Sequence, residues 1–452
     1  MMIVSAFEKI IRVRSVDLAV LDESAYYEAI YAGSSVPNRR FYAIESPFRM
    51  NSQVSVPPGN GSVTNKNKSR RKRKRGVSSN ITCNLSDVST VLKKILEKAV
   101  MMDAFNENHC GPAQCSSFET SVNFNNYLAR QLVLTATSVP CPLSRYGKQY
   151  YFAKQSIKEI CLNQEERTID DISNELVMWV NDGPEVIIAR CKGEKFILPP
   201  FSSFIVNDAC VTEALIRYGK RFDFVLLDPP WENKSVKRKT VYPIYGDHKW
   251  MLDLCLPELL TESGLLAIWV TNNAKHLKFT DDMIEYFGFE KIAIWRWLKV
   301  TNSGEPVYNL NSQHKQPFEN IVFASCSAAR RHYMNIVDEF VLIRHIFLTN
   351  LDSHNSFYIE CHSYQHACCT KYLNFFGDIF DNISQAEKAK AEEANTPSAI
   401  HSRKPPLLPV LQALGILEET AEQLELYGRY LLPRTTTVGF EAAKLQNERY
   451  FV

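Results

Sequence analysis

The sequence predicts an α/β protein whose larger part, residues 184–452, is a doubly wound domain. Several apolar runs are short and continuous, as strands that are buried on both faces require. Helical stretches such as 249–260 lie between some of these runs, and this alternation is typical of doubly wound sheets. The expected strands are 186–190, 195–198 (a hairpin with the preceding run), 204–206, 222–227, 265–270, 292–298, 321–323 and 424–427.

The first 183 residues are expected to be organised differently. Residues 1–50 carry short apolar stretches and several tyrosines, and residues 51–80 are rich in Pro, Gly, Ser and Asn, which predicts a disordered linker. Apolar residues recur at helical spacing over 88–99, with Ser86 available as N-cap. We therefore expect residues 81–183 to form a mainly helical accessory domain.

Composition and charge narrow the class of protein only a little. Hydrophobic residues make up 45% of the chain and charged residues 23%, and no apolar run reaches the roughly 18–20 residues that cross a bilayer. The twelve cysteines are scattered, which favours a reducing compartment. Residues 70–75 are six consecutive basic residues, which favour nuclear import or nucleic-acid binding over a merely solubilising linker. We expect a soluble, monomeric protein of the nucleus, with a cytosolic or mitochondrial pool left open and no membrane partner.

The tetrapeptide Asp228-Pro229-Pro230-Trp231 follows directly on the predicted strand 222–227. Open α/β sheets bind ligands at the carboxyl ends of their strands, and the two prolines hold the chain there in a rigid turn. An aromatic amine is a poor nucleophile because its lone pair is delocalised into the ring. The Asp228 carboxylate and the Pro229 carbonyl can accept its N–H bonds and return electron density to nitrogen, while Trp231 stacks on the base. The motif predicts methyl transfer to an amino group by orientation and preorganised polarity, without a metal; the alternative is a surface turn.

A basic loop follows the motif. Phosphate contacts made there would be independent of base sequence and sensitive to salt, although a solvated charge run alone would be unremarkable. An adenine amino group is out of reach inside a duplex, so the expected substrate is a nucleic acid with a flipped or single-stranded base. The four candidate cations are Lys234, Lys237, Arg238 and Lys239.

Segments of the second half resemble the MT-A70 family of adenine N6 methyltransferases. They are 196–200, 204–208, 228–231, 269–276, 295–305, 314–319, 402–406 and 425–429. The stretches 295–305 and 314–319 are particularly similar to one branch of that family. The order of the motifs, with Asp-Pro-Pro-Trp ahead of the expected cofactor strand, resembles a permuted methyltransferase. The resemblance implies a Rossmann-like methyltransferase domain that uses S-adenosyl-L-methionine to methylate N6 of adenine in RNA (small nuclear RNA included) or in DNA.

The resemblance also implies roles for individual residues. Asp208 and Ala209 fall where the family contacts the adenine of the cofactor, and Lys404 falls where a lysine approaches the methionine carboxylate. Residues 425–429 resemble the strand and turn that hold the ribose. The implied cofactor set is Asp208, Ala209, Asp228, Lys404, Arg429 and Glu441, and Glu319 joins the loop cations in the implied substrate set.

Two departures from the family pattern bear on activity. Phe440 stands where the family has an asparagine that bonds the cofactor, and Leu431 and Leu432 offer the ribose no polar side chain. An insertion is expected over residues 325–397, where the family has a shorter link. Its cysteines and histidines fit no zinc spacing, so we expect no metal.

Three functions stay open from the sequence. An active adenine N6 methyltransferase is favoured because Asp228, Trp231 and Lys404 are intact. A non-catalytic nucleic-acid-binding subunit of a methyltransferase complex is the alternative that the altered cofactor segment suggests. Methyl transfer to cytosine N4 or to a protein amide is disfavoured by Trp231. We expect His248 and His276 to be structural or surface residues rather than acid–base groups.

Overall fold

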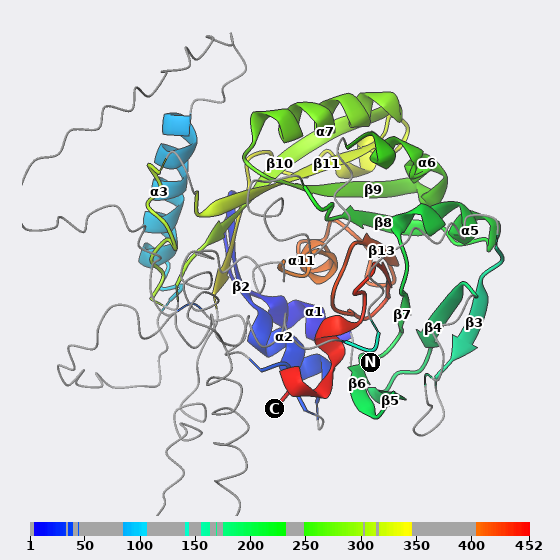
Figure 1. Ribbon diagram of the computed structural model, residues 1–452. Coiled ribbons are helices and arrows are strands. Elements are labelled where there is room, and N and C mark those ends of the chain that lie inside the picture. The colour runs from blue at the N-terminus through cyan, green and yellow to red at the C-terminus, as the bar shows by residue number, and fades with distance from the viewer. Residues whose placement is uncertain are drawn as a thin grey trace, which may run out of the picture.

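The architecture is one large mixed sheet with helices on both faces (Figure 1). The computed structural model describes residues 4–32, 35–38, 44, 85–105, 141–143, 155–162, 169, 175–231, 248–301, 303–312, 316–345 and 404–452. In sheet order the twelve strands are β1 (Ile11–Arg14), β2 (Leu18–Asp22), β12 (Val341–His345), β10 (Phe289–Lys299), β11 (Phe318–Cys326), β9 (Leu260–Val270), β8 (Phe222–Leu227), β13 (Gln423–Leu426), β14 (Thr435–Val438), β7 (Ser202–Ile205), β4 (Val177–Asn181) and β3 (Lys158–Cys161).

Helices cover the two faces of this sheet, which confirms the doubly wound α/β class. Figure 1 shows α6 (Leu256–Leu259) and α7 (Ala274–Tyr286) on one side of β8 and β9, and α11 (Leu407–Ala413) on the other. The remaining described α-helices are α1 (Val4–Phe7), α2 (Glu23–Ile30), α3 (Leu85–Met101) and α5 (Thr212–Arg217).

Strand β8 shows why its sequence is a continuous apolar run. Phe224 and Leu226 pack in the core under α1, α2 and α11, whereas Val225 and Leu227 pack in the core under α5, α6 and α7. Both sets are buried, which explains why residues 224–227 are apolar on both faces of the strand. Strands β9, β8, β13, β14 and β7 run parallel to one another in that order, which brings their carboxyl ends to one edge.

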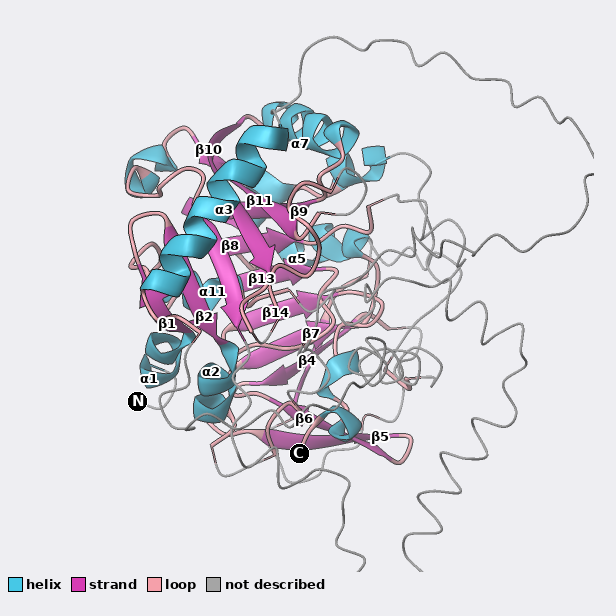
Figure 2. Cartoon of the chain, turned by 90° about the vertical axis from the view of Figure 1, so that its left-hand side faces the viewer, coloured by secondary structure: helices cyan, strands magenta, loops and turns pink. Residues whose placement is uncertain are grey.

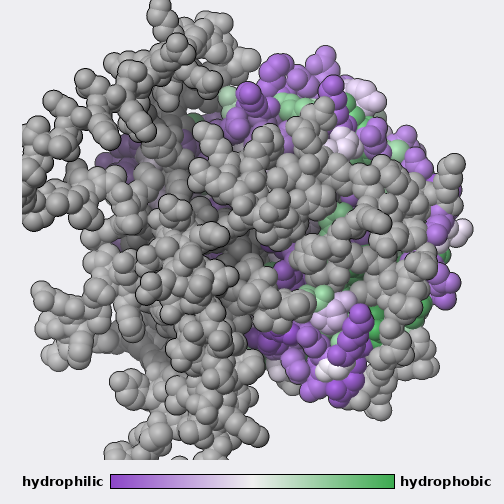
Figure 3. All heavy atoms as spheres, viewed as in Figure 1, coloured by the Kyte–Doolittle hydropathy of each residue, from purple (hydrophilic) through white to green (hydrophobic). Residues whose placement is uncertain are grey.

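Helix α7 is amphipathic, and the two sides of its sequence explain its orientation. His276, Thr280 and Met283 recur at i, i+4 and i+7 and are buried against the sheet. Its charged residues, such as Lys278 and Asp282, are exposed, and Figure 3 shows hydrophilic side chains gathered over this helix. The expectation that His276 is a structural residue fits this position better than a surface location.

Other local predictions are also confirmed. The predicted hairpin is formed by β5 (Ile187–Cys191) and β6 (Glu194–Leu198), which make a separate two-stranded sheet. Lys192 and Gly193 form its turn with φ of 48° and 85°, the left-handed values that tight hairpin turns need. The predicted amphipathic helix is α3, which begins at Leu85, one residue before the expected cap Ser86. Figure 2 shows α3 lying across the sheet beside β2.

Several expectations for the first half and for the insertion are corrected. Residues 158–161 and 177–181 were expected in a mainly helical region but form strands β3 and β4, because β4 pairs with β7 and β3 with β4. Strands β1 and β2 join the large sheet through β12, which lies inside the expected insertion 325–397. Residues 341–345 therefore belong to the sheet. The predicted linker 51–80 and the basic run 70–75 lie outside the described residues.

The predicted helix over 249–260 is broken in two. A 3-10 helix, η4 (His248–Asp253), ends before Cys255, which has a left-handed φ of 46°, and α6 follows. Pro257 explains the break, because proline has no N–H for an intrahelical bond but is favoured in the first turn of a new helix. No helix in the described part of the chain is long and apolar enough to cross a bilayer.

Candidate active site

The Asp-Pro-Pro-Trp motif leaves β8 at the edge where the parallel strands end. The Asp228 N–H donates to Leu426 O at 3.2 Å, which continues the ladder to β13 for one more bond. The prolines then end it, and the Trp231 N–H donates back to Pro229 O at 2.7 Å. The motif is therefore a tight, fixed turn, and the surface-turn alternative is wrong because Trp231 is 6% exposed.

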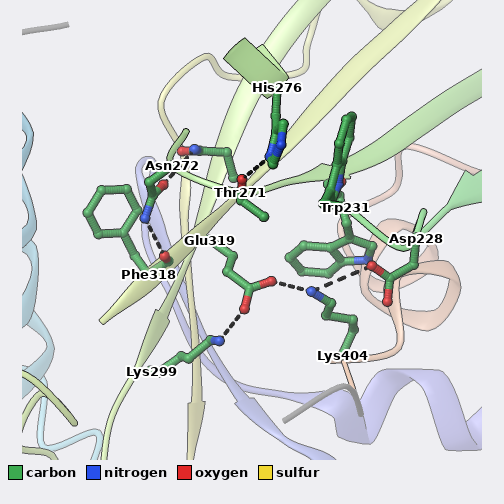
Figure 4. A network of polar contacts seen from close by, with 11 residues as sticks. Asp228, Trp231, Thr271, Asn272, His276, Lys299, Phe318, Glu319 and Lys404 are labelled. Carbon is green, nitrogen blue, oxygen red and sulfur yellow. Dashed lines mark hydrogen bonds and ion pairs between the residues drawn. The ribbon is translucent and has the colours of Figure 1, made fainter. Parts of the chain in front are cut away.

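A chain of alternating charges extends from Asp228 (Figure 4). Lys404 Nζ lies 3.6 Å from Asp228 Oδ1 and also bonds to Glu319 Oε2. The other oxygen of Glu319 accepts a bond from Lys299 Nζ. These side chains are largely buried, with exposures of 11% for Lys404, 14% for Lys299 and 23% for Glu319. The structure therefore brings three predicted site residues together and adds Lys299 to them.

Burial and neighbouring charges set the protonation of this chain. Burial raises the pKa of Asp228, and the Lys404 ammonium opposes that shift. Burial acts on Glu319 in the same direction, but the ammonium groups of Lys299 and Lys404 outweigh it and hold the pKa of Glu319 well below its usual range. Burial lowers the pKa of Lys404, yet the two carboxylates beside it raise the pKa more. Lys404 thus remains a cation between two carboxylates.

Lys299 is not among the site residues that the sequence predicts, although it lies in the segment 295–305 that resembles the family. Lys299 ends β10, and Glu319 is the second residue of β11. Their neighbours Leu298 and Phe318 are paired across the two antiparallel strands, which sets the lysine beside the carboxylate. The signal that the sequence offers is the charge of Lys299, which directly follows the predicted strand 292–298.

The indole of Trp231 is held by its N–H and by neighbouring rings. Trp231 Nε1–H donates to Trp269 O at 2.6 Å. The His276 ring stacks on the indole with centroids 4.8 Å apart, and the His248 ring meets it edge-on at 5.0 Å. The expected stacking of Trp231 on a base stays a prediction.

The expected cofactor residues lie where β7, β13 and β14 end. Asp208 follows β7 and accepts the Cys210 N–H at 3.2 Å, and Ala209 begins the 3-10 helix η3 (Ala209–Val211). Arg429 follows β13, and its Nε lies 3.3 Å from Glu441 Oε2 after β14. Glu441 is also bonded to Lys444. These positions gather at the same edge as Asp228, because parallel strands end on the same side.

Glu425 adds a buried carboxyl group that the sequence did not single out. It is 3% exposed, and its Oε2 has no hydrogen-bond partner among the described residues. Burial, helped by the charge of Asp228, raises the pKa of Glu425 to about 8. Beside it, the chain passes so close to β14 that a Cβ on Gly428 would lie 2.5 Å from Thr437 Cγ2, which explains the glycine.

The raised pKa of Glu425 predicts a specific dependence of stability on pH. Between its usual value of 4.5 and about 8 the folded state keeps a proton that the unfolded state has lost. The free energy of unfolding is therefore expected to fall as pH rises through this window, by at most ~1.4 kcal/mol for each pH unit. Glu425→Gln removes this slope, which denaturant titrations of both proteins at pH 5 and pH 8 would measure. The exposed neighbour Glu422 provides the control Glu422→Gln. Equal slopes for Glu425→Gln and wild type would contradict the assignment.

Some predicted residues cannot be placed. The loop cations Lys234, Lys237, Arg238 and Lys239 lie outside the described residues, as do the cysteines and histidines of 361–369. Among the described residues no group of three metal-ligating side chains comes together.

Comparison with known proteins agrees with this geometry. The family model MT-A70 matches residues 222–357, which contain Asp228, Trp231, Lys299 and Glu319. A DNA N6-methyl methyltransferase of Caenorhabditis elegans is 29% identical over 450 residues, which cover 96% of this chain and 98% of that protein.

Two further relatives match over a shorter stretch. The N(6)-adenine-specific methyltransferase METTL4 of Homo sapiens is 30% identical over 64% of this chain and 52% of its own length. The N6-methyladenosine RNA methyltransferase MTA1 of Pyricularia oryzae is 28% identical over 42% of this chain and 52% of its own length. The chain thus spans about half the length of these two relatives. Methyltransferase-like protein 4 is the branch that segments 295–305 and 314–319 resemble, and residues 222–357 are similar to the MT-A70 family.

Proposed function

We propose that this protein is an S-adenosyl-L-methionine-dependent methyltransferase that acts on N6 of adenine in RNA or DNA. The observation that carries the proposal is the placement of Asp228, which a rigid turn holds at the carboxyl end of a central parallel strand, beside Lys404 and Trp231. The relatives are named as a DNA N6-methyl methyltransferase, an N(6)-adenine-specific methyltransferase and an N6-methyladenosine RNA methyltransferase, which supports this substrate class.

The turn provides two acceptors for an aromatic amino group. The Asp228 carboxylate has Lys404 beside it, and this cation favours the charged form against the cost of burial. The Pro229 carbonyl accepts one bond from Trp231 N–H, and a carbonyl oxygen has a second lone pair to offer. Two acceptors that face the two N–H bonds of the amine fix its orientation and raise electron density on nitrogen. This preorganised polarity is the rate-enhancing feature that we assign to the site.

The residues at the strand ends fit the cofactor. Glu425 Oε2, which has no hydrogen-bond partner in the described part of the chain, would bond to a ribose hydroxyl, and Arg429 follows the same strand. Asp208 and Ala209 would hold the adenine, and Lys404 would hold the methionine carboxylate. When bound, S-adenosyl-L-methionine supplies an electrophilic methyl group on a sulfonium centre.

A non-catalytic nucleic-acid-binding subunit is the second candidate. Leu431 and Leu432 are each 1% exposed and Phe440 is partly buried, so these three positions give the cofactor no polar side chain. In the same C-terminal segment, Arg429 and Glu441 already pair with each other, with 3.3 Å between Arg429 Nε and Glu441 Oε2.

Calorimetry and a transfer assay distinguish these candidates. We expect the wild type to bind S-adenosyl-L-methionine and to methylate single-stranded RNA or DNA oligonucleotides that contain adenine. Parallel assays of RNA and DNA of the same sequence decide between the two polymers, because only RNA offers a 2′-hydroxyl. Nucleic-acid binding without methyl transfer to any oligonucleotide would overturn the enzyme assignment in favour of the subunit.

We further propose a nuclear location and a monomeric state. The location rests on the basic run 70–75, whose composition is that of an import signal. Imaging of the full chain and of a variant with these residues replaced by alanine tests the location. Sedimentation of the purified chain tests the monomer.

A further inference from the structure

The His276 ring covers one face of Trp231. The His276 and Trp231 rings are nearly parallel, at 21° between planes and 4.8 Å between centroids. Both side chains are buried, with 4% of His276 and 6% of Trp231 exposed to solvent. One face of the indole is therefore covered by the His276 ring.

His276 is itself fixed from several sides. Its Nδ1 lies 2.6 Å from Thr271 Oγ1, which follows β9 (Figure 4). The helix that carries it is capped by Asn273, whose side chain accepts the Lys275 N–H at 3.0 Å. One turn later the fully buried Thr280 donates its hydroxyl to His276 O at 2.9 Å. The ring and the backbone of His276 therefore both have defined positions.

Two more rings complete the support for the indole. His248 meets Trp231 edge-on at 5.0 Å and His276 edge-on at 5.1 Å. Phe279, which lies on the same helix as His276, meets the indole edge-on at 6.5 Å. With the bond from Trp231 Nε1 to Trp269 O, these contacts restrain the indole at its face, its edge and its N–H.

We propose that His276 is a positioning residue that holds the Trp231 indole in the orientation that the target base requires. The inference rests on the proposed function. Small errors in the position of a reacting group cost large factors in rate. Base–aromatic stacking is itself worth ~1–3 kcal/mol, and a tryptophan that changes its orientation would lose both contributions.

Three variants separate the stacked ring from the hydrogen bond. His276→Ala removes both, His276→Phe keeps an aromatic ring without the bond, and Thr271→Val keeps the imidazole without its partner. We expect kcat to fall about tenfold or more in His276→Ala, about threefold in Thr271→Val, and less than about threefold in His276→Phe. The KM for S-adenosyl-L-methionine is expected to be unchanged. His332→Ala, at an exposed histidine, is the control.

A second measurement reads base stacking without turnover. In a single-stranded oligonucleotide with 2-aminopurine in place of its one adenine, stacking on an indole quenches the fluorescence of the probe. Wild type and His276→Phe are expected to quench it, and His276→Ala is expected to quench it at least threefold less. The fluorescence measurement tests the role of His276 even if the wild type transfers no methyl group. Absence of methyl transfer would overturn the proposed function but not the role of His276.

Two results would overturn the inference. His276→Ala with the kcat and quenching of the wild type would show that the indole needs no such support. Loss of both in His276→Phe, with a melting temperature lowered as much as in His276→Ala, would show that the residue serves only to pack the helix.

Discussion

Asp228→Asn is expected to reduce the rate of methyl transfer by about 10²–10³-fold, because an amide at this position cannot offer a negative charge to the amine. Asparagine has nearly the same shape as aspartate, and Lys404 keeps Glu319 as a bonded partner. The variant is therefore expected to fold. Its affinity for S-adenosyl-L-methionine, measured by calorimetry, is expected to fall by less than about tenfold, since the other expected cofactor residues are intact.

The matched control is Asp253→Asn, at an exposed aspartate that is not among the predicted site residues. It is expected to keep the wild-type rate. If Asp228→Asn retained more than a tenth of the wild-type rate, the carboxylate would not be the group that activates the amine.

Glu319→Gln is expected to lower the free energy of unfolding by about 2–3 kcal/mol at pH 7. Removing the carboxylate leaves Lys299 and Lys404 with Asp228 as the one carboxylate partner among the described residues, and an unpaired buried cation is costly. Because 23% of the Glu319 side chain is exposed, the expected loss lies at or below the lower end of the ~3–5 kcal/mol that breaking a fully buried ion pair costs. Equilibrium denaturation of the wild type and the variant measures it.

The lowered pKa of Glu319 fixes the sign of the pH dependence. Its stabilising effect is fully present above its usual pKa of 4.5 and is lost as pH falls towards the lower pKa of the folded state. The difference between wild type and Glu319→Gln is therefore expected to shrink below pH 4.5. A difference that grew in acid would contradict the pairing.

Lys299→Met in the Glu319→Gln background tests the charge chain itself. Burial lowers the pKa of Lys299, which shows that its charge is costly in this position. Once Glu319 is replaced by a neutral residue, removal of the Lys299 charge is therefore expected to raise the free energy of unfolding. The double variant is expected to be more stable than Glu319→Gln alone by about 1 kcal/mol or more. Simple addition of two destabilising effects would show that the two residues do not interact.

Sequence patterns predicted the elements whose determinants are local. The strand at 222–227 was evident because both of its faces are buried, and α3 was evident because its apolar residues recur at helical spacing. The motif at 228–231 could be placed at a strand end for the same reason. Roles such as that of Lys404 came only through the family resemblance.

The remainder depends on pairings between distant segments, which a local pattern does not report. Strand β12 is only five residues long, and its place in the sheet depends on β10 and β2, which lie on either side of it. The position of Lys299 beside Glu319 depends on the register between β10 and β11. The stack of His276 on Trp231 requires α7 to turn its buried face toward the motif, across 45 residues of sequence.

The central claim is that the turn after β8 presents an adenine amino group for methylation. The most direct measurement uses S-adenosyl-L-methionine with an isotopically labelled methyl group, a single-stranded adenine-containing oligonucleotide and mass spectrometry of the digested nucleosides. We expect the label on N6 of adenine with the wild type and its loss with Asp228→Asn. Label on another atom or another base, or equal label with both proteins, would contradict it.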